Sequence, residues 1–311
     1  MSFLGAHHIT RADDTPATPL DACWQAALYV GQGLAFIRRT PGLYLLITSV
    51  YAMPALLAGA VAAYAREPVA WQRVVVLGLP WITIVLGAVV IMVAVGYQAR
   101  GQEVDLARAT RVGVCWVPRY VWTNVHTSLI FWVPIGMLFA AREWQAKWSP
   151  ASGPADMAIS GLWWLAIICC ALYLHTRTVL APFLAVHADL PGTLAALEAW
   201  RLGGRHFPLC LTTLVLGSLP VALPLGLLAL ILTRNLSGRV YEVMAAASPE
   251  LAWAGIQAVR PVLIAALYPL YRDLWQREWA RRKQEGAERV PPPARALLAI
   301  TRPLPKLGGW D

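Results

Sequence analysis

The sequence predicts an all-α, polytopic membrane protein, and its composition is the first reason. Of the 311 residues, 58% are hydrophobic and only 14% are charged, whereas ordinary soluble domains carry about 25% charged residues. Long uncharged runs recur along the chain, each near the ~20 residues that an α-helix needs to cross a bilayer. This pattern excludes a disulfide-built secreted domain and a soluble nucleotide-binding enzyme.

Six apolar segments are expected to be transmembrane helices. Their ranges are 41–64, 74–97, 118–140, 159–186, 207–233 and 250–271. Most of the 26 Lys and Arg residues lie before the first span, after the second and fourth spans, and after the last one. Because positive charge is retained on the cytoplasmic side, both termini are predicted to be cytoplasmic. Residues 1–40 then form a cytoplasmic segment, 41–271 the membrane domain and 272–311 a basic tail.

A threefold pattern divides the membrane domain into parallel repeats. An arginine enters each odd-numbered span and a proline follows it fifteen residues later; the pairs are Arg39 and Pro54, Arg119 and Pro134, and Arg205 and Pro220. Short amphipathic stretches at 21–37, 103–115 and 192–204 precede the arginines, and we expect them to be helices lying in the headgroup plane. Each arginine would mark the elbow between this helix and a membrane hairpin, and each proline would kink the span.

Few polar side chains interrupt the spans, and four of them are candidate lipid or solute contacts. His126 and Asn124 lie in the third span, where an interhelical hydrogen bond is the simplest role for His126. Arg177, near the end of the fourth span, is expected to extend toward the inner surface. Arg260 has two interpretations: it lies deep in the last span and faces the bundle, or the helix breaks at Pro261 and places it at the outer interface.

The residues indicate no catalytic, metal or cofactor site. The interior of the first five spans has no Asp or Glu, the histidines form no HExxH motif, and the five cysteines form no CxxC pair. The basic residues flank apolar runs rather than forming a soluble patch, so nucleic acid is not an expected partner. We therefore expect a protein that is not an enzyme and has no cofactor.

Two stretches resemble a bacterial family of six-span membrane proteins. Residues 180–211, LAPFLAVHADLPGTLAALEAWRLGGRHFPLCL, carry Asp189, Pro191, Trp200 and Gly204 at positions of that family's pattern. The segment LYPLYRDLWQRE is similar to its closing motif, with the matching residues Tyr271, Asp273 and Arg277. The family is related to the membrane domain of glycerophosphodiester phosphodiesterases and to YciC-like proteins. The resemblance implies a six-helix domain of the bacterial inner membrane, without the soluble barrel that carries the phosphodiesterase chemistry.

Two functions are consistent with these features. The first is a non-catalytic integral membrane protein, a subunit or scaffold of a membrane or envelope complex, in contact with lipids and with other membrane or envelope proteins. The basic tail would then bind anionic lipid headgroups. The alternative is a carrier or channel for a small anionic or amphipathic solute, with Arg260 and His126 lining the route.

Overall fold

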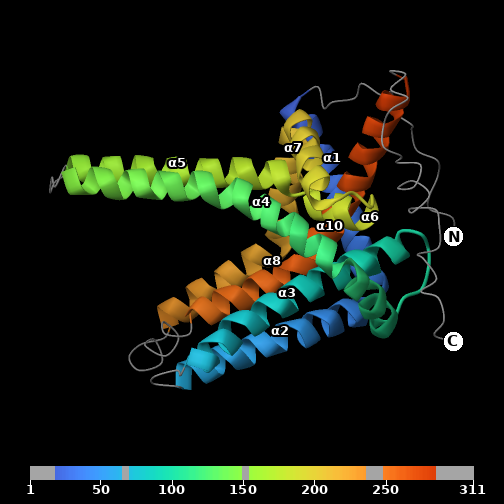
Figure 1. The fold of residues 1–311 in the computed structure, drawn as a ribbon, viewed down its shortest axis with the longest axis horizontal. Helices are drawn as coiled ribbons and strands as arrows, with labels where there is room; N and C mark the ends of the chain where they lie inside the picture. Colours follow the sequence, from blue (N-terminus) through green and yellow to red (C-terminus); the bar gives the residue numbers. More distant parts are fainter. Residues whose placement is uncertain (1–17, 65–69, 149–153, 236–247, 285–311) are drawn as a thin grey trace.

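The computed structural model describes residues 18–64, 70–148, 154–235 and 248–284, and these residues are almost entirely α-helical, with no strand among them. The all-α fold class is therefore confirmed. The helices, with Figure 1 giving their labels, are α1 (Pro19–Arg39), α2 (Pro41–Tyr64), α3 (Ala70–Gln98), α4 (Leu106–Trp148), α5 (Pro154–Thr178), α6 (Ala181–His187), α7 (Gly192–Arg205), α8 (Phe207–Asn235) and α10 (Ser248–Gln284).

The helices α1 and α7 occupy the first and third of the stretches expected to be amphipathic. At the start of α1, the Thr18 hydroxyl accepts a hydrogen bond from the Asp21 N–H at 3.2 Å, and the Asp21 carboxylate accepts one from the Thr18 N–H at 3.1 Å. This capping box satisfies two backbone donors that the first helical turn leaves free. Arg38 and Arg39 lie in its last turn, where positive charge complements the helix dipole.

The middle stretch, 103–115, is helical from Leu106 but is not a separate helix, contrary to the prediction. It forms the first turns of α4, which continues without interruption through Pro118 and Pro134. Figure 1 shows α4 changing direction along its length. A proline inside a helix removes one hydrogen bond and favours a bend, and a long helix tolerates this when its other turns remain intact. The expected elbow at Arg119 is therefore a position within a bent helix.

The expected continuous helix over 159–186 is also wrong, because α5 ends at Thr178 and α6 begins at Ala181. Pro182 occupies the first turn of α6. Its ring would clash with the carbonyl of the residue four positions earlier, which is Thr178, so the helix ends there. The remaining apolar ranges lie within α2, α3, α8 and α10, and α10 passes through Arg260 and Pro261 without a break.

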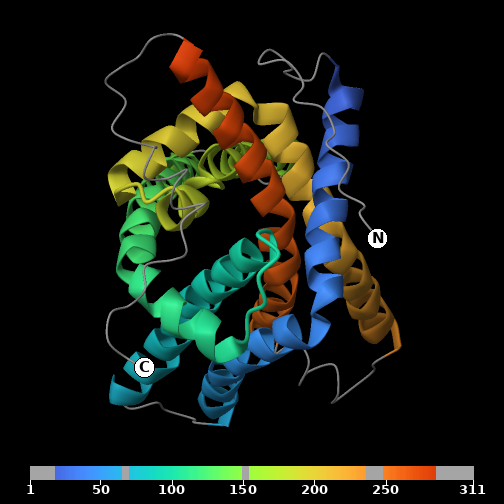
Figure 2. The same ribbon diagram turned by 90° about the vertical axis from the view of Figure 1, so that its right-hand side faces the viewer.

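The N-terminal and C-terminal helices of the described chain pack side by side. Figure 2 shows α1, in blue, running along α10, in red, with α8 beside them. Gly33 permits the close approach, because a Cβ atom there would lie 2.5–2.6 Å from the backbone of Ala265 and Ala266. Buried side chains of α3, α6 and α10 form the main core, including Val89, Phe183 and Tyr271. This core unites helices from the beginning, middle and end of the chain.

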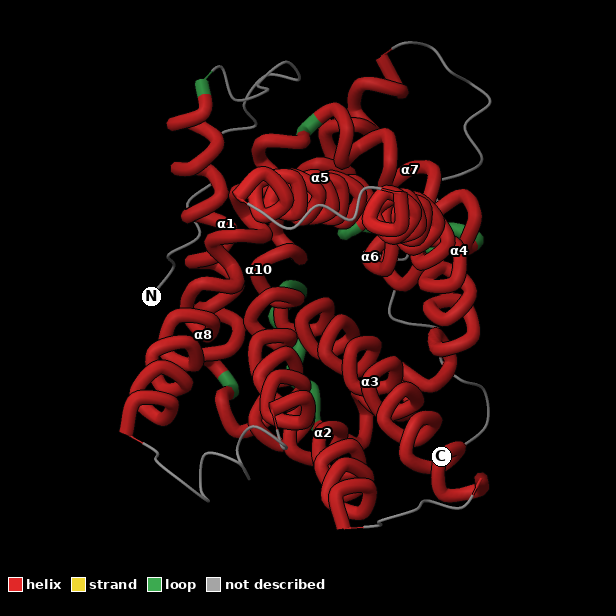
Figure 3. The backbone as a smooth tube through the Cα atoms, turned by 90° about the vertical axis from the view of Figure 1, so that its left-hand side faces the viewer, coloured by secondary structure: helices red, strands yellow, loops and turns green. Residues whose placement is uncertain are grey.

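The α4–α5 hairpin diverges from the other long helices. Figures 1 and 3 show it extending apart from the group formed by α2, α3, α8 and α10. Its own small core contains Ile135, Ile167 and Leu174, while many of its large apolar side chains, such as Leu129 and Leu165, are exposed. Among the described residues, two segments are long and apolar enough to cross a membrane: Leu106–Gln145, in α4, and Ala158–His187, which covers most of α5 and all of α6.

Candidate functional site

Arg260 points from α10 toward two neighbouring helices. Its Nη1 donates a hydrogen bond to the backbone carbonyl of Ile84 in α3 at 2.8 Å, and its Nη2 lies 3.4 Å from the Tyr120 hydroxyl in α4. Tyr120 is buried and Arg260 is half-buried. A carbonyl and a hydroxyl are the acceptor types that an arginine requires where no carboxylate is near. Of the two interpretations of Arg260, the helix break at Pro261 is absent, because α10 continues through it, and Arg260 connects α3, α4 and α10.

His126 and Asn124 make contacts within α4. The His126 ring uses Nδ1 in a 2.8 Å hydrogen bond with the Trp122 carbonyl, and it packs edge-on against the Trp122 indole at a centroid distance of 4.8 Å. The Asn124 carbonyl accepts a hydrogen bond from the Thr127 hydroxyl at 3.1 Å. The hydrogen bonds described for His126 and Arg260 have no partner in common, so they do not join the two residues in one site.

Two elbow arginines bind carboxylates that lie beyond the hairpins they begin. Arg119 forms an ion pair with Asp189 in the α6–α7 connection, and Arg205 contacts Glu278 in α10 at 2.5 Å. Arg39, the first elbow arginine, makes no such ion pair among the described residues, but Thr40 beside it has a related contact. The Gln98 amide at the end of α3 donates a hydrogen bond to the Thr40 hydroxyl. We call these three pairs the closing contacts, because each joins the start of an apolar hairpin to its far end. Arg39 itself is exposed, with its guanidinium 6.0 Å from the Phe36 ring.

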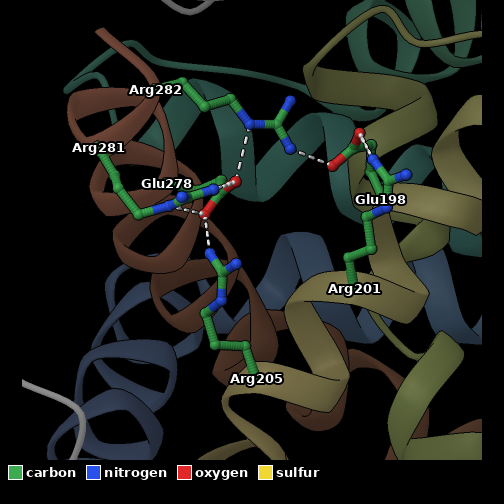
Figure 4. Close-up of polar contacts among 6 residues, drawn as sticks. All are labelled: Glu198, Arg201, Arg205, Glu278, Arg281 and Arg282. Atoms are coloured by element: carbon green, nitrogen blue, oxygen red, sulfur yellow. Dashed lines mark hydrogen bonds and ion pairs between the residues drawn. The ribbon is translucent and has the colours of Figure 1, made fainter. Parts of the chain in front are cut away.

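Ion pairs concentrate around Glu278, between α7 and the C-terminal part of α10. We call this group the Glu278 cluster, and Figure 4 shows its members: Glu198, Arg201, Arg205, Glu278, Arg281 and Arg282. The Glu278 side chain is only 6% exposed and lies within 2.7 Å of nitrogens from Arg205, Arg281 and Arg282. Arg282 also contacts Glu198 at 2.5 Å, so it bridges the two carboxylates.

The cluster holds its carboxylate strongly ionised. Burial alone would raise the pKa of Glu278, but hydrogen bonds from Arg281 and Arg282 and the charges of Arg282 and Arg205 outweigh it and lower this pKa to about 2. Burial likewise disfavours the charged form of Arg282, yet hydrogen bonds to Glu198 and Glu278 raise its pKa. Four arginines and two glutamates leave an excess of positive charge, so the cluster is a structural ion-pair network with a basic surface.

The residues of the family-like motifs have structural positions that the sequence did not reveal. Asp189 has a positive φ of 56°, a backbone conformation that aspartate tolerates better than most residues, and Pro191 is the N-cap of α7. Asp273 accepts a hydrogen bond from the Tyr29 hydroxyl of α1 and forms an ion pair with Arg277 at 2.7 Å. Burial, followed by the Asp273 charge, raises the pKa of Tyr29. Tyr271 is fully buried in the core.

Trp200 and Gly204 of the same motif lie against Arg177 of α5. The Arg177 guanidinium carbon is 4.3 Å from the Trp200 ring centroid, and Gly204 is so close that a Cβ there would lie less than 3.0 Å from guanidinium atoms. Arg177 was expected to extend toward the membrane surface; the structure shows its guanidinium stacked on Trp200 of α7. Trp200 and Gly204 of the motif therefore form a binding surface, which we call the seat, for the Arg177 guanidinium.

Sequence reasoning did not identify Tyr29, Gln98, Glu198 or Glu278 as site residues. One signal was present: Glu278 has arginines three and four positions later, at helical ion-pair spacing. The contacts between α7 and α10, and between α1 and α10, join residues as far as 244 positions apart. Such pairs follow only from the tertiary arrangement.

The described residues contain no group of three or more His, Cys, Asp or Glu side chains that could hold a metal ion, and the five cysteines are free thiols. Comparisons with protein-family models, curated proteins and solved structures found no match to this chain.

Proposed function

We propose that this chain is a non-catalytic integral membrane protein that serves as a subunit or scaffold of a bacterial inner-membrane or envelope complex. It would have six spans, with both termini cytoplasmic, and its surroundings would include lipids and a partner membrane protein. The observation that carries this proposal is the α4–α5 hairpin, whose long apolar helices extend apart from the rest of the bundle.

The exposed side chains of this hairpin support insertion into a bilayer. Five of them have 57–68% of their residue surface exposed: Leu129, Trp132, Met137, Leu162 and Leu165. Apolar surface left in water costs about 25 cal/mol per Å², and patches of this extent mark membrane or protein contacts. In hydrocarbon that cost disappears, because the surrounding lipid tails are equally apolar.

The distribution of exposure on α5 supports a partner as well as lipid. Positions 164–166 and 168–169 are all exposed. Consecutive helical residues point about 100° apart, so such runs cover much more than the single stripe that a packed helix leaves free. A hairpin accessible on several sides offers a surface for a partner helix, and the Glu278 cluster holds the opposite end of the molecule in a fixed arrangement.

A spin-label experiment tests insertion. Cys169 and Cys23 are both exposed, on α5 and α1 respectively, while Cys210 is buried. With Cys115, Cys170 and either Cys23 or Cys169 replaced by alanine, single labels at Cys169 and at Cys23 would be compared in reconstituted vesicles. We expect high oxygen and low nickel-chelate accessibility at Cys169, and the reverse at Cys23. Strong nickel-chelate accessibility at Cys169 would contradict membrane insertion of the hairpin.

Photo-crosslinking tests the scaffold role. A benzoylphenylalanine at Leu165 in native membranes should give an adduct with one protein of reproducible mass, whereas the same residue at buried Val89 should give none. Adducts with lipid alone at Leu165 and at Trp132 would contradict the subunit proposal while leaving the membrane assignment intact.

The alternative, a carrier or channel for an anionic or amphipathic solute, is favoured by Arg260 alone. Its guanidinium lies where α3, α4 and α10 meet, a position at which a charged group is expected to be functional. If this alternative holds, Arg260→Leu should abolish solute uptake into vesicles and Arg260→Lys should retain part of it, with normal insertion of both variants. Equal uptake by wild type and Arg260→Leu would exclude it.

A further inference from the structure

Arg177 lies in the last turn of α5 with its guanidinium between two aromatic rings. Its Cζ is 4.3 Å from the Trp200 ring centroid and 5.4 Å from that of Tyr173. The two rings are 6.1 Å apart and nearly perpendicular, at 89°. Cation–π contacts of this kind fix the plane of a guanidinium without using its N–H groups.

Two glycines of α7 form the remaining wall of this seat. A Cβ at Gly204 would lie less than 3.0 Å from three guanidinium atoms, and a Cβ at Gly203 would lie 2.8–2.9 Å from the Arg177 backbone. Any larger residue at either position would displace Arg177. The helix α7 therefore presents a flat, side-chain-free surface at the point where the arginine lies.

The guanidinium has no acceptor among the described residues. Its Nε atom is enclosed without a hydrogen-bond partner, while Arg177 as a whole is half-buried. The arginines of the Glu278 cluster each bind a carboxylate, and Arg260 binds a carbonyl. An arginine that is oriented and partly desolvated, yet has unused donors, is prepared for an anion, and its fork matches phosphate oxygens in particular.

The surroundings fit a lipid phosphate better than a solute. The partly exposed rings of Trp200 and Tyr173 are amphipathic side chains of the type found at headgroup level, and Arg201, 70% exposed, adds positive charge on the next residue of α7. We propose that Arg177 binds the phosphate of an anionic glycerophospholipid, with Trp200 and Tyr173 packing against its glycerol and upper acyl region. This inference rests on the proposed membrane location of the chain.

The first test measures stabilisation of the purified full-length chain in non-ionic detergent. We expect phosphatidylglycerol to raise the melting temperature of the wild type and of the control variant Arg142→Gln, whose arginine in α4 pairs with Glu143. It should bind Arg177→Gln about tenfold more weakly, because one charge-assisted hydrogen-bonded contact is lost. Arg177→Lys should be intermediate, because it retains the charge but lacks the planar fork. Phosphatidylcholine is the neutral lipid control. Equal stabilisation of wild type and Arg177→Gln by phosphatidylglycerol would overturn the proposal.

Inorganic phosphate distinguishes the two sources of the same chemistry. If millimolar phosphate reproduces the effect of phosphatidylglycerol on the wild type, the site binds free phosphate and the lipid assignment is wrong. No such effect is expected, because the aromatic rings contribute only when the ligand has an apolar part.

A second measurement does not depend on any variant folding. A phosphatidylglycerol with a photoreactive headgroup should form adducts on the peptides containing residues 173–177 or 200–204, mapped by mass spectrometry. Adducts elsewhere, with none in these ranges, would overturn the proposal even if Arg177→Gln is unstable. The spin-label result at Cys169 separates this failure from failure of the membrane assignment, because it does not involve Arg177.

Discussion

The α4–α5 hairpin and the Glu278 cluster stabilise their helices in opposite ways. In the hairpin, large apolar side chains such as Leu129 and Leu165 face outward, and the ion pair of Arg142 is with its neighbour Glu143 on the same helix. In the cluster, Glu278 is buried and its ion pairs join α7 to α10. The polar contacts that join α4 to α5 include a hydrogen bond from the Trp163 indole to Gln145 and the stacking of Arg142 on Trp164, neither of which is an ion pair. The helices at the other end meet one another through charge.

The largest expected effect comes from removing the central carboxylate of the cluster. Glu278→Leu leaves three arginine side chains around a buried apolar group. Breaking a fully buried pair costs about 3–5 kcal/mol, and the partial exposure of Arg205 and Arg281 places this variant at the lower end of that range. We expect a large drop in the melting temperature in detergent. Glu143→Gln in the hairpin is the matched control, and its exposed pair should contribute less than about 1 kcal/mol. Equal losses in the two variants would show that the two regions are not stabilised differently.

Glycine substitutions provide a second contrast between packed and open helices. Gly33→Ala places a methyl group 2.5–2.6 Å from the backbone of α10, so α1 must move away, at a cost of about 1–3 kcal/mol. Gly136→Ala in α4 meets nothing within 4 Å and should stabilise the helix by about 0.5–1 kcal/mol. Gly31→Ala, on α1 but with open space around it, is the control on the same helix. We expect Gly33→Ala to lower the melting temperature relative to the wild type and Gly31→Ala to raise it.

Acid should weaken the Glu278 cluster. The pKa of Glu278 falls from 4.5 to about 2 on folding, so its contribution is fully present above pH 4.5 and is lost as the pH falls toward 2. Because Arg205 is half exposed, solvent screening reduces the loss to about 1–2 kcal/mol. We expect the melting temperature to decline between pH 5 and pH 3 in the wild type and to decline less in Glu278→Gln. Parallel declines in both would assign the acid sensitivity to other groups.

The smallest effect is expected at the α6–α7 connection. Asp189→Asn keeps a residue that tolerates positive φ and removes only the ion pair with Arg119, whose side chains are 35% and 44% exposed; the cost should be below about 1 kcal/mol. Asp189→Ala loses the same pair and adds about 1 kcal/mol of backbone strain. The difference between the two variants therefore measures the strain. If Asp189→Ala is as stable as Asp189→Asn, the positive φ carries no cost.

Local sequence patterns predicted most helices because their signals are local. The helix α2 runs from Pro41 to Tyr64, the range expected from its apolar run, and α7 begins at the predicted residue after Pro191. The two errors have one physical origin, the context of proline. Pro118 lies within a helix that continues, whereas Pro182 begins a new one, with Thr178 as the last residue of α5. The proline in the sequence LAPFL, residues 180–184, was therefore a visible sign of the second helix start.

The candidate sites were less predictable because their partners come from distant segments. Arg260 and His126 were expected together in the carrier alternative, but Arg260 contacts a carbonyl of α3 and a hydroxyl of α4, and His126 contacts a carbonyl of its own helix. Asp273 was singled out through a motif, while its partner Tyr29 lies near the other end of the chain. The tail arginines Arg281 and Arg282 were expected to bind lipid, and they bind glutamates. Residues 285–311 of the predicted tail lie outside the described residues.

The closing contacts have a consequence for synthesis of the chain. Thr40 and Gln98 are 58 residues apart, and Arg205 and Glu278 are 73 apart, so each hairpin can fasten soon after its second helix leaves the ribosome, within seconds at 5–20 residues per second. The bond between Tyr29 and Asp273 spans 244 residues and must wait for nearly the whole chain. During synthesis, the three hairpins would therefore close one after another, each soon after its second helix is made. The contact between α1 and α10 would form last.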